Sequence, residues 1–156
     1  MDKGKTLALL NSLVEINNDR IEGYHVAIDD TYESDLKSLF STFIKTSIKC
    51  RAELAGEVII LGGVPAEGTN ASAKLHQTWM DLKALITGND RVAILNSCEY
   101  GENAAIETYN QALIDNGEDL NTYQVNMLID HRALIKADLK EITYLRDMIQ
   151  TANNAV

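Results

Sequence analysis

Two glutamates of one predicted helix lie at positions where apolar residues are the usual choice. Residues 93–113 read AILNSCEYGENAAIETYNQAL, and at about 100° per residue they form a helix with one apolar stripe. The stripe consists of Leu95, Ile106, Tyr109 and Leu113. Glu99 and Glu102 fall within roughly 40° of Leu95 on the helical wheel, so we expect both carboxylates to face the core. Inward carboxylates either bind a cation or are neutralised by basic side chains of neighbouring helices.

The elements that must position these glutamates are helices. Apolar residues at helical spacing predict five helices and no strand. They cover residues 3–32, 34–61 and 73–87, a fourth stretch that starts after Asn89 or Asp90 and ends at the DNG sequence of residues 115–117, and residues 121–150. We expect Ser34 to cap the second helix, and Asn121 and Gln124 to cap the last helix reciprocally. Trp79 is expected to anchor the short third helix against the others.

The lengths of the connections predict the topology. Tight turns make the first two helices antiparallel, and likewise the last two. A link of about 27 residues, which carries the short helix, can travel the length of a bundle and leave the second and fourth helices parallel. The whole chain, 1–156, therefore reads as a single all-α domain, a ferritin-like four-helix bundle with a crossover. An up-down-up-down bundle with the short helix capping one end is the alternative.

Composition restricts the function classes. The chain has 156 residues, a net charge of -9 and 46% hydrophobic residues, typical of a soluble globular protein. No basic cluster is present, which argues against nucleic acid and anionic membranes as partners. No signal peptide or membrane-spanning segment is visible, so we expect a cytoplasmic protein with two free cysteines, Cys50 and Cys98. No residue grouping supports nucleophilic catalysis, which favours a protein that is not an enzyme.

Four stretches resemble a known family. The end of the second helix, LGGVP, is similar to helix ends of several ferritin-like proteins. NNDRIEGYHVAIDD, TWMDLKALITG and CEYGENAAIETY together resemble an uncharacterised bacterial ferritin-like family, known mainly as a four-helix domain of unknown function. The resemblance runs from about Leu7 to Met148. It implies a ferritin-like bundle and supplies no established substrate or reaction.

The wider ferritin-like superfamily uses di-iron or di-manganese sites, so the resemblance raises the question of a metal site. The segment EGYH supplies Glu22 and His25 with Glu-x-x-His spacing. At about 1.5 Å per residue from the turns, Glu22, Glu99 and Glu102 lie within one helical turn of each other. His131 on the last helix completes the candidate set. The carboxylates would bridge iron or manganese ions and the histidines would complete the coordination.

The second helix fits this metal interpretation poorly. It contains no Glu-x-x-His, and its acids Glu53 and Glu57 lie roughly 10–16 Å below the level of the other candidates. Asp138 on the last helix lies near that level. The ferritin ligand pattern is therefore incomplete in this chain.

The competing interpretation is an ionic network without metal. Arg51 and Arg132 both lie about 40° from the apolar stripes of their helices and can face the inward glutamates. Asn17 and Asn18 can complete the hydrogen bonding. Such a network predicts a non-enzymatic binding or structural module, and we expect it to form a homodimer. The metal interpretation predicts a carboxylate-bridged protein that handles iron, manganese or oxygen species.

Overall fold

The computed structural model describes residues 2–68, 73–88 and 90–154. Its elements are α1 (Lys3–Asp30), α2 (Ser34–Ile60), α3 (Ala73–Gly88), α4 (Arg91–Asp115), the short 3₁₀ helix η1 (Gly117–Asp119) and α5 (Thr122–Asn154). No strand occurs in these ranges, which confirms the predicted all-α class. Within the same ranges, no helix has an apolar stretch long enough to cross a membrane.

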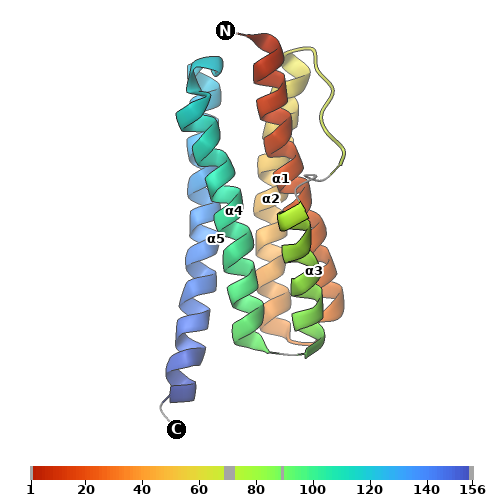
Figure 1. Cartoon of the computed structure of the whole chain (residues 1–156), viewed down its shortest axis with the longest axis vertical. Helices are drawn as coiled ribbons and strands as arrows, with labels where there is room; N and C mark the ends of the chain where they lie inside the picture. The colour runs from red at the N-terminus through yellow and green to blue at the C-terminus, as the bar shows by residue number, and fades with distance from the viewer. Residues whose placement is uncertain (1, 69–72, 89, 155–156) are drawn as a thin grey trace.

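The four long helices lie roughly along one axis (Figure 1). Helix α2 returns antiparallel beside α1, and α5 returns antiparallel beside α4. The connection after α2 travels back along the bundle before α3 begins, so that α2 and α4 point in the same direction (Figure 1). Helix α3, with 16 residues, is shorter than α1 with 28 and α4 with 25, and packs against both. The end of α5 extends beyond the other helices.

The hydrogen bonds at the helix ends confirm the predicted cap of α5 and not the predicted cap of α2. The backbone N–H of Gln124 donates to Oδ1 of Asn121 at 2.8 Å, and the N–H of Asn121 donates to Oε1 of Gln124 at 3.0 Å. This is the predicted reciprocal cap of α5. Ser34 is the first residue of α2 and not its cap. The cap is Glu33, and its side chain makes no capping hydrogen bond.

The apolar core is divided into two clusters along the bundle. The cluster nearer the N-terminus contains Leu10, Leu13, Leu54, Val58, Tyr109, Leu128 and Ile135 among its buried residues. The other contains Tyr24, Leu36, Phe40, Phe43, Leu82, Leu95 and Ile142. On α1 the two clusters are separated by the segment from Asn17 to Arg20, whose four side chains are polar and buried. A polar layer therefore crosses the middle of the bundle.

Helix α3 is anchored by one large side chain, as predicted. Trp79 packs against both apolar clusters, and its ring lies 5.1 Å from that of Tyr24 in an edge-to-face arrangement. The indole contacts the backbone of α1 at Gly23, where an added Cβ would lie 2.4 Å from Cε3 of the ring. On α4, a Cβ added at Gly101 would lie 3.4 Å from Cη2 of the Trp79 ring. The absence of a side chain at residue 23 therefore permits α3 to dock.

This close approach gives a test of the fold. Gly23→Ala should lower the free energy of unfolding by about 1–3 kcal/mol, because the added methyl group overlaps the Trp79 ring. Urea unfolding followed by the emission of Trp79, the single tryptophan of the chain, measures this directly. The matched control is Gly56→Ala within α2, where a Cβ meets nothing within 4 Å. The control should gain up to about 1 kcal/mol from helix propensity. Equal gains in both variants would contradict the packing of α3 on α1.

Candidate functional site

The middle of the bundle holds a buried ion pair between α1 and α4. Arg20 is 1% exposed and Glu102 is 0% exposed. Nε of Arg20 donates to Oε1 of Glu102 at 3.2 Å, and Nη2 donates to Oε2 at 2.9 Å, so the guanidinium binds both carboxylate oxygens. The hydroxyl of Tyr24 donates to the same Oε1 at 2.5 Å. Burial disfavours the charge on Arg20, but Glu102, Tyr24 and Asp138 together outweigh it and raise the pKa of the guanidinium, with Glu102 contributing most.

A second carboxylate reaches the same guanidinium from α5. Nη2 of Arg20 donates to Oδ2 of Asp138 at 3.2 Å, and the hydroxyl of Thr46 on α2 donates to Oδ1 at 3.5 Å. Asp138 is 6% exposed. Burial raises the pKa of Asp138 to about 6, although Arg20 acts in the opposite direction. All four long helices therefore contribute a side chain to this layer, and its two acids share one arginine.

A chain of hydrogen bonds leads from this layer towards the surface. Nη1 of Arg20 donates to Oδ1 of Asn17 at 3.5 Å, and Nδ2 of Asn17 donates to the Tyr109 hydroxyl at 3.0 Å. That hydroxyl lies 3.2 Å from Nδ1 of His131. Nε2 of His131 lies 2.5 Å from Oε2 of Glu53, which is half exposed on α2.

The direction of this chain assigns the proton of the histidine. The ionised carboxylate of Glu53 can only accept a hydrogen bond, so its contact requires a proton on Nε2 of His131, and Nδ1 of the neutral ring accepts from the Tyr109 hydroxyl. The proton of the imidazole then resides on Nε2 and is donated to Glu53. Burial lowers the pKa of His131, which favours the neutral ring that this arrangement requires, although Glu53 opposes the shift.

Two of the five predicted metal ligands lie on the inner face of the bundle. Glu102 and His131 are both 0% exposed, but each already has the protein partners described above. Glu22 and His25 are exposed on α1, and Glu99 is partly exposed on α4. The expected inward orientation of Glu99 is therefore wrong. In the described part of the chain, no three His, Cys, Asp or Glu side chains are grouped closely enough to hold a metal ion.

The position of Glu99 follows from the face that α4 buries. Leu95, Cys98 and Glu102 lie along the centre of that face, and Glu99 lies at its edge. There its carboxylate forms an ion pair with Arg146 of α5, at a partly exposed site. A helical wheel drawn around a broad apolar stripe does not locate the centre of the buried face to better than about one neighbouring position. That uncertainty is too large to separate Glu99 from Glu102.

The arginines predicted to neutralise the inner acids make other contacts. Nη1 of Arg51 donates to Asn18 at 3.4 Å, and Nη1 of Arg132 donates to Asn110 at 2.8 Å. The prediction that an arginine neutralises the inner acids is confirmed, but the prediction that Arg51 and Arg132 do so is wrong, because Arg20 supplies the charge. The spacing that identifies it is a run of residues three or four apart on α1: Leu10, Leu13, Asn17, Arg20, Tyr24 and Ala27.

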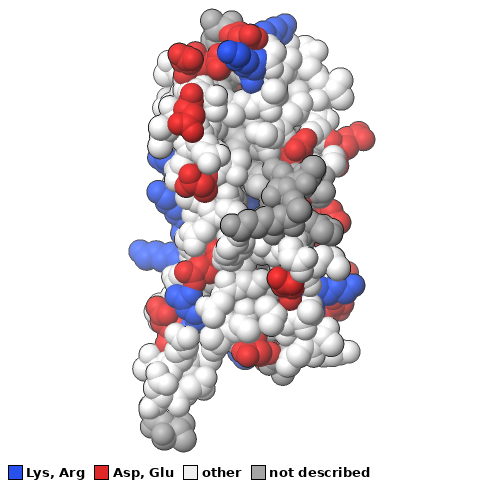
Figure 2. Space-filling view, viewed as in Figure 1, with Lys and Arg blue, Asp and Glu red and all other residues white. Residues whose placement is uncertain are grey.

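Charges on the surface are dispersed. On the face seen in Figure 2, acidic and basic side chains are separated by broad uncharged areas, and Lys and Arg form no single broad patch there. The absence of a nucleic-acid partner stays a prediction.

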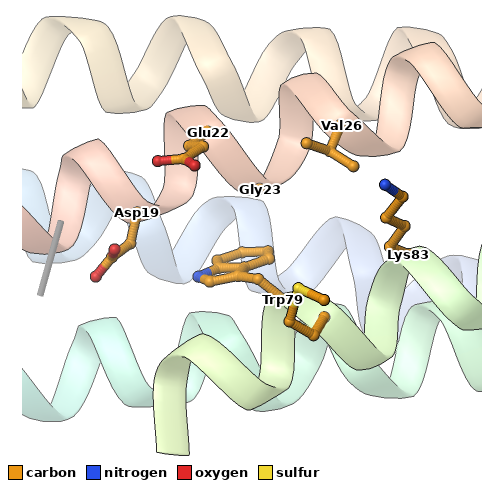
Figure 3. A pocket seen from close by; sticks show the side chains of 7 residues that line it. Asp19, Glu22, Gly23, Val26, Trp79 and Lys83 are labelled. Carbon is orange, nitrogen blue, oxygen red and sulfur yellow. The ribbon is translucent and has the colours of Figure 1, made fainter. Parts of the chain in front are cut away.

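A second candidate site is a cavity between α1 and α3, of about 160 Å³ (Figure 3). Helix α1 contributes Asp19, Glu22, Gly23 and Val26, and helix α3 contributes Trp79, Met80 and Lys83. Carboxylates lie at one end of the cavity and the Lys83 side chain at the other, with the indole between them (Figure 3). The cavity therefore combines an aromatic wall with charges of both signs, as small-molecule sites commonly do.

The shared arginine gives a stability prediction. Arg20→Met should lower the free energy of unfolding by about 3–5 kcal/mol, because it leaves two buried carboxylates without their cation. Arg146→Met is the matched control, since it removes an arginine from a partly exposed pair between α5 and α4, and should cost less than about 1 kcal/mol. Urea unfolding at neutral pH measures both. Losses of similar size in the two variants would show that the buried ion pairs of Arg20 stabilise the fold no more than the partly exposed pair of Arg146.

The raised pKa of Asp138 gives a pH prediction. Between about pH 4 and pH 6 the folded protein holds a proton on Asp138 that the unfolded chain has released, so this residue makes stability fall as the pH rises. Asp138→Asn removes that proton exchange. The unfolding free energy of the wild type, relative to the variant, should therefore fall by about 2–3 kcal/mol from pH 4 to pH 7. Paired urea titrations across this range measure it, and a difference independent of pH would refute the assignment.

Comparison with known families provides the remaining evidence on identity. A family model described as a domain of unknown function (DUF2383) matches residues 5–115, from the start of α1 to the end of α4. The match includes Arg20 and Glu102 but not Asp138 and His131, which lie on α5. Comparison with the curated proteins finds no match. Since the matched segment makes up most of the chain, the protein belongs to the DUF2383 family of domains of unknown function.

Proposed function

We propose that this chain is a non-enzymatic binding and structural module, built as a ferritin-like bundle around a neutralised ionic layer. The observation that carries the proposal is Arg20, which lies between Glu102 and Asp138 in the middle of the bundle. A guanidinium at this point supplies the positive charge that a metal ion would otherwise supply to converging carboxylates. The layer then orients the helices, and the surface remains available for binding.

The state of the buried reactive groups supports a role without catalysis. Burial raises the pKa of Cys50 to about 11, and burial and Glu102 raise that of Cys98 further, so both remain neutral thiols at neutral pH. Burial likewise raises the pKa of Tyr24, with Glu102 adding to the shift. These groups therefore lack the ionised form that nucleophilic chemistry needs.

The alternative is a carboxylate-bridged di-iron or di-manganese protein with Glu22, His25, Glu99, Glu102 and His131 as ligands. Its support is the convergence of Glu102 and Asp138 from facing helices on one cation. As arranged, the five residues do not fit such a centre, because Glu22 and His25 are exposed and Arg20 occupies both oxygens of Glu102. The alternative therefore requires Arg20 to leave and α1 to rotate.

Metal loading separates the two proposals. After anaerobic incubation with Fe(II) and desalting, the wild type should retain far less than the roughly two irons per chain of a dinuclear site. Metal content by mass spectrometry measures the retention, and Mn(II) is tested in parallel. Retention of about two metals per chain, abolished by Glu102→Gln and unaffected by the surface variant Glu141→Gln, would establish the alternative.

Assembly and location belong to the proposal as well. We propose a cytoplasmic homodimer, and the support for self-association is the exposed apolar surface at the end of α5. There Tyr144 is 66% exposed and Met148 is 52% exposed. Light scattering coupled to gel filtration reports the assembly state, and a monomeric mass would count against the dimer.

A further inference from the structure

The connection between α4 and α5 contains Asn116 followed by Gly117, the only Asn–Gly pair in the sequence. It lies at the end of the bundle that also holds the N-terminus (Figure 1). Asn116 is exposed and forms the C-cap of α4, and Gly117 begins η1. In an Asn–Gly pair, the backbone nitrogen of the glycine can attack the side-chain amide of the asparagine, because the glycine has no Cβ to obstruct the approach. The pair is therefore a candidate for a covalent change of the backbone.

The two groups that would react are not engaged elsewhere. Within the described part of the chain, neither the side-chain amide of Asn116 nor the backbone N–H of Gly117 has a hydrogen-bond partner. A Cβ built at Gly117 would meet nothing within 4 Å, so the glycine borders open space. The attack therefore sacrifices no hydrogen bond of either group, and water has access to the exposed asparagine.

The backbone conformation sets a condition on the attack. The ψ angle of Asn116 is 15°, which turns the Gly117 nitrogen away from the Asn116 side chain, so the peptide between them must rotate first. The carbonyl oxygen of Asn116 accepts from the N–H of Asp119 at 3.0 Å, and rotation breaks this bond. The carbonyl oxygen of Asp119 in turn accepts from the Thr6 hydroxyl on α1 at 2.5 Å. The 3₁₀ helix η1, which this bond holds against α1, therefore has to open locally.

We propose that Asn116 is a site of spontaneous deamidation whose rate is set by the opening of η1. The Gly117 nitrogen forms a bond to Cγ of Asn116, and the amide nitrogen leaves as ammonia with the proton of the Gly117 N–H. The product is a cyclic imide, which one water molecule then opens. Cleavage of the bond between the nitrogen and Cγ gives an aspartate. Cleavage at the main-chain carbonyl carbon gives a β-aspartyl linkage, in which the backbone runs through the former side chain.

Both products place a negative charge where it is unfavourable. The C-terminal end of α4 already carries partial negative charge from its free carbonyl groups. Asp115, Glu118 and Asp119 are close neighbours of Asn116 in the sequence. We expect the new carboxylate to weaken η1 and its contact with Thr6, so that the modification loosens the connection between α4 and α5. This site is separate from the ionic layer and goes beyond the proposed binding role.

The test follows the conversion in the full chain during incubation at neutral pH. Peptide mapping by mass spectrometry detects the change from amide to acid, and fragmentation distinguishes aspartate from the β-aspartyl form. The internal control is Asn103, which is also exposed but lies inside α4 and precedes Ala104. We expect conversion of Asn116 to both products while Asn103 remains intact.

A variant of the glycine tests the chemistry. Gly117→Ala should slow the conversion about ten-fold, because the added methyl group obstructs the approach of the nitrogen. The open space at this position accommodates the methyl group, so the fold should be unaffected, as circular dichroism verifies. An unmodified Asn116 in the wild type, or an equal rate in Gly117→Ala, overturns the proposal.

A variant of the threonine tests the role of η1. Thr6→Val removes the hydroxyl that bonds to Asp119 and should accelerate the conversion about five-fold, the factor that corresponds to one hydrogen bond. Thr6→Ser keeps the hydroxyl and should stay close to the wild-type rate. Intact Asn103 in both variants shows that the acceleration comes from local opening and not from global unfolding. A rate in Thr6→Val equal to that of the wild type overturns the assigned role of η1.

Discussion

The rest of the structure depends on keeping one guanidinium charged in the middle of an apolar bundle. Arg20 is buried, so its charge is tolerable only with carboxylates at hydrogen-bond distance. Glu102 and Asp138 meet this requirement from two different helices, which fixes the level of α4 and α5 against α1. Apolar contacts alone would tolerate a shift of one helix along another, since one aliphatic side chain can replace its neighbour. A two-oxygen contact to a guanidinium does not tolerate such a shift.

The same layer connects elements that do not contact the arginine. Tyr24 donates to Glu102 and packs edge-to-face against Trp79, so the anchor of α3 lies one contact from the ion pair. In the other direction, Asn17, Tyr109 and His131 continue the hydrogen bonding to Glu53 at the surface of α2. Both apolar clusters therefore border a polar layer whose groups are mutually oriented. Conformational specificity of the bundle is the role that this arrangement suits best.

Membership of the DUF2383 family carries no chemistry with it, and a helical bundle can host many functions. The two polar sites of this chain differ in kind. The mid-bundle layer is closed, and its groups bond to each other. The cavity beside Trp79 adjoins an exposed carboxylate and a buried N–H without an acceptor. The ionic layer holds α1 against α4 and α5, and α3 packs on α1 and α4.

The sequence by itself determined the helices, the reciprocal cap at Asn121, the anchoring role of Trp79 and the presence of an inward acid at Glu102. These features follow from periodicity and from contacts between residues a few positions apart. Which basic residue meets Glu102 was decided only by the tertiary structure. Glu102 and Arg20 are 82 positions apart, and the rotation of α1 about its axis depends on packing against three other helices at once. The spacing on α1 places Arg20 on its inner face, but Arg51 and Arg132 also lie near the apolar stripes of their helices, so spacing alone does not select the arginine that meets Glu102.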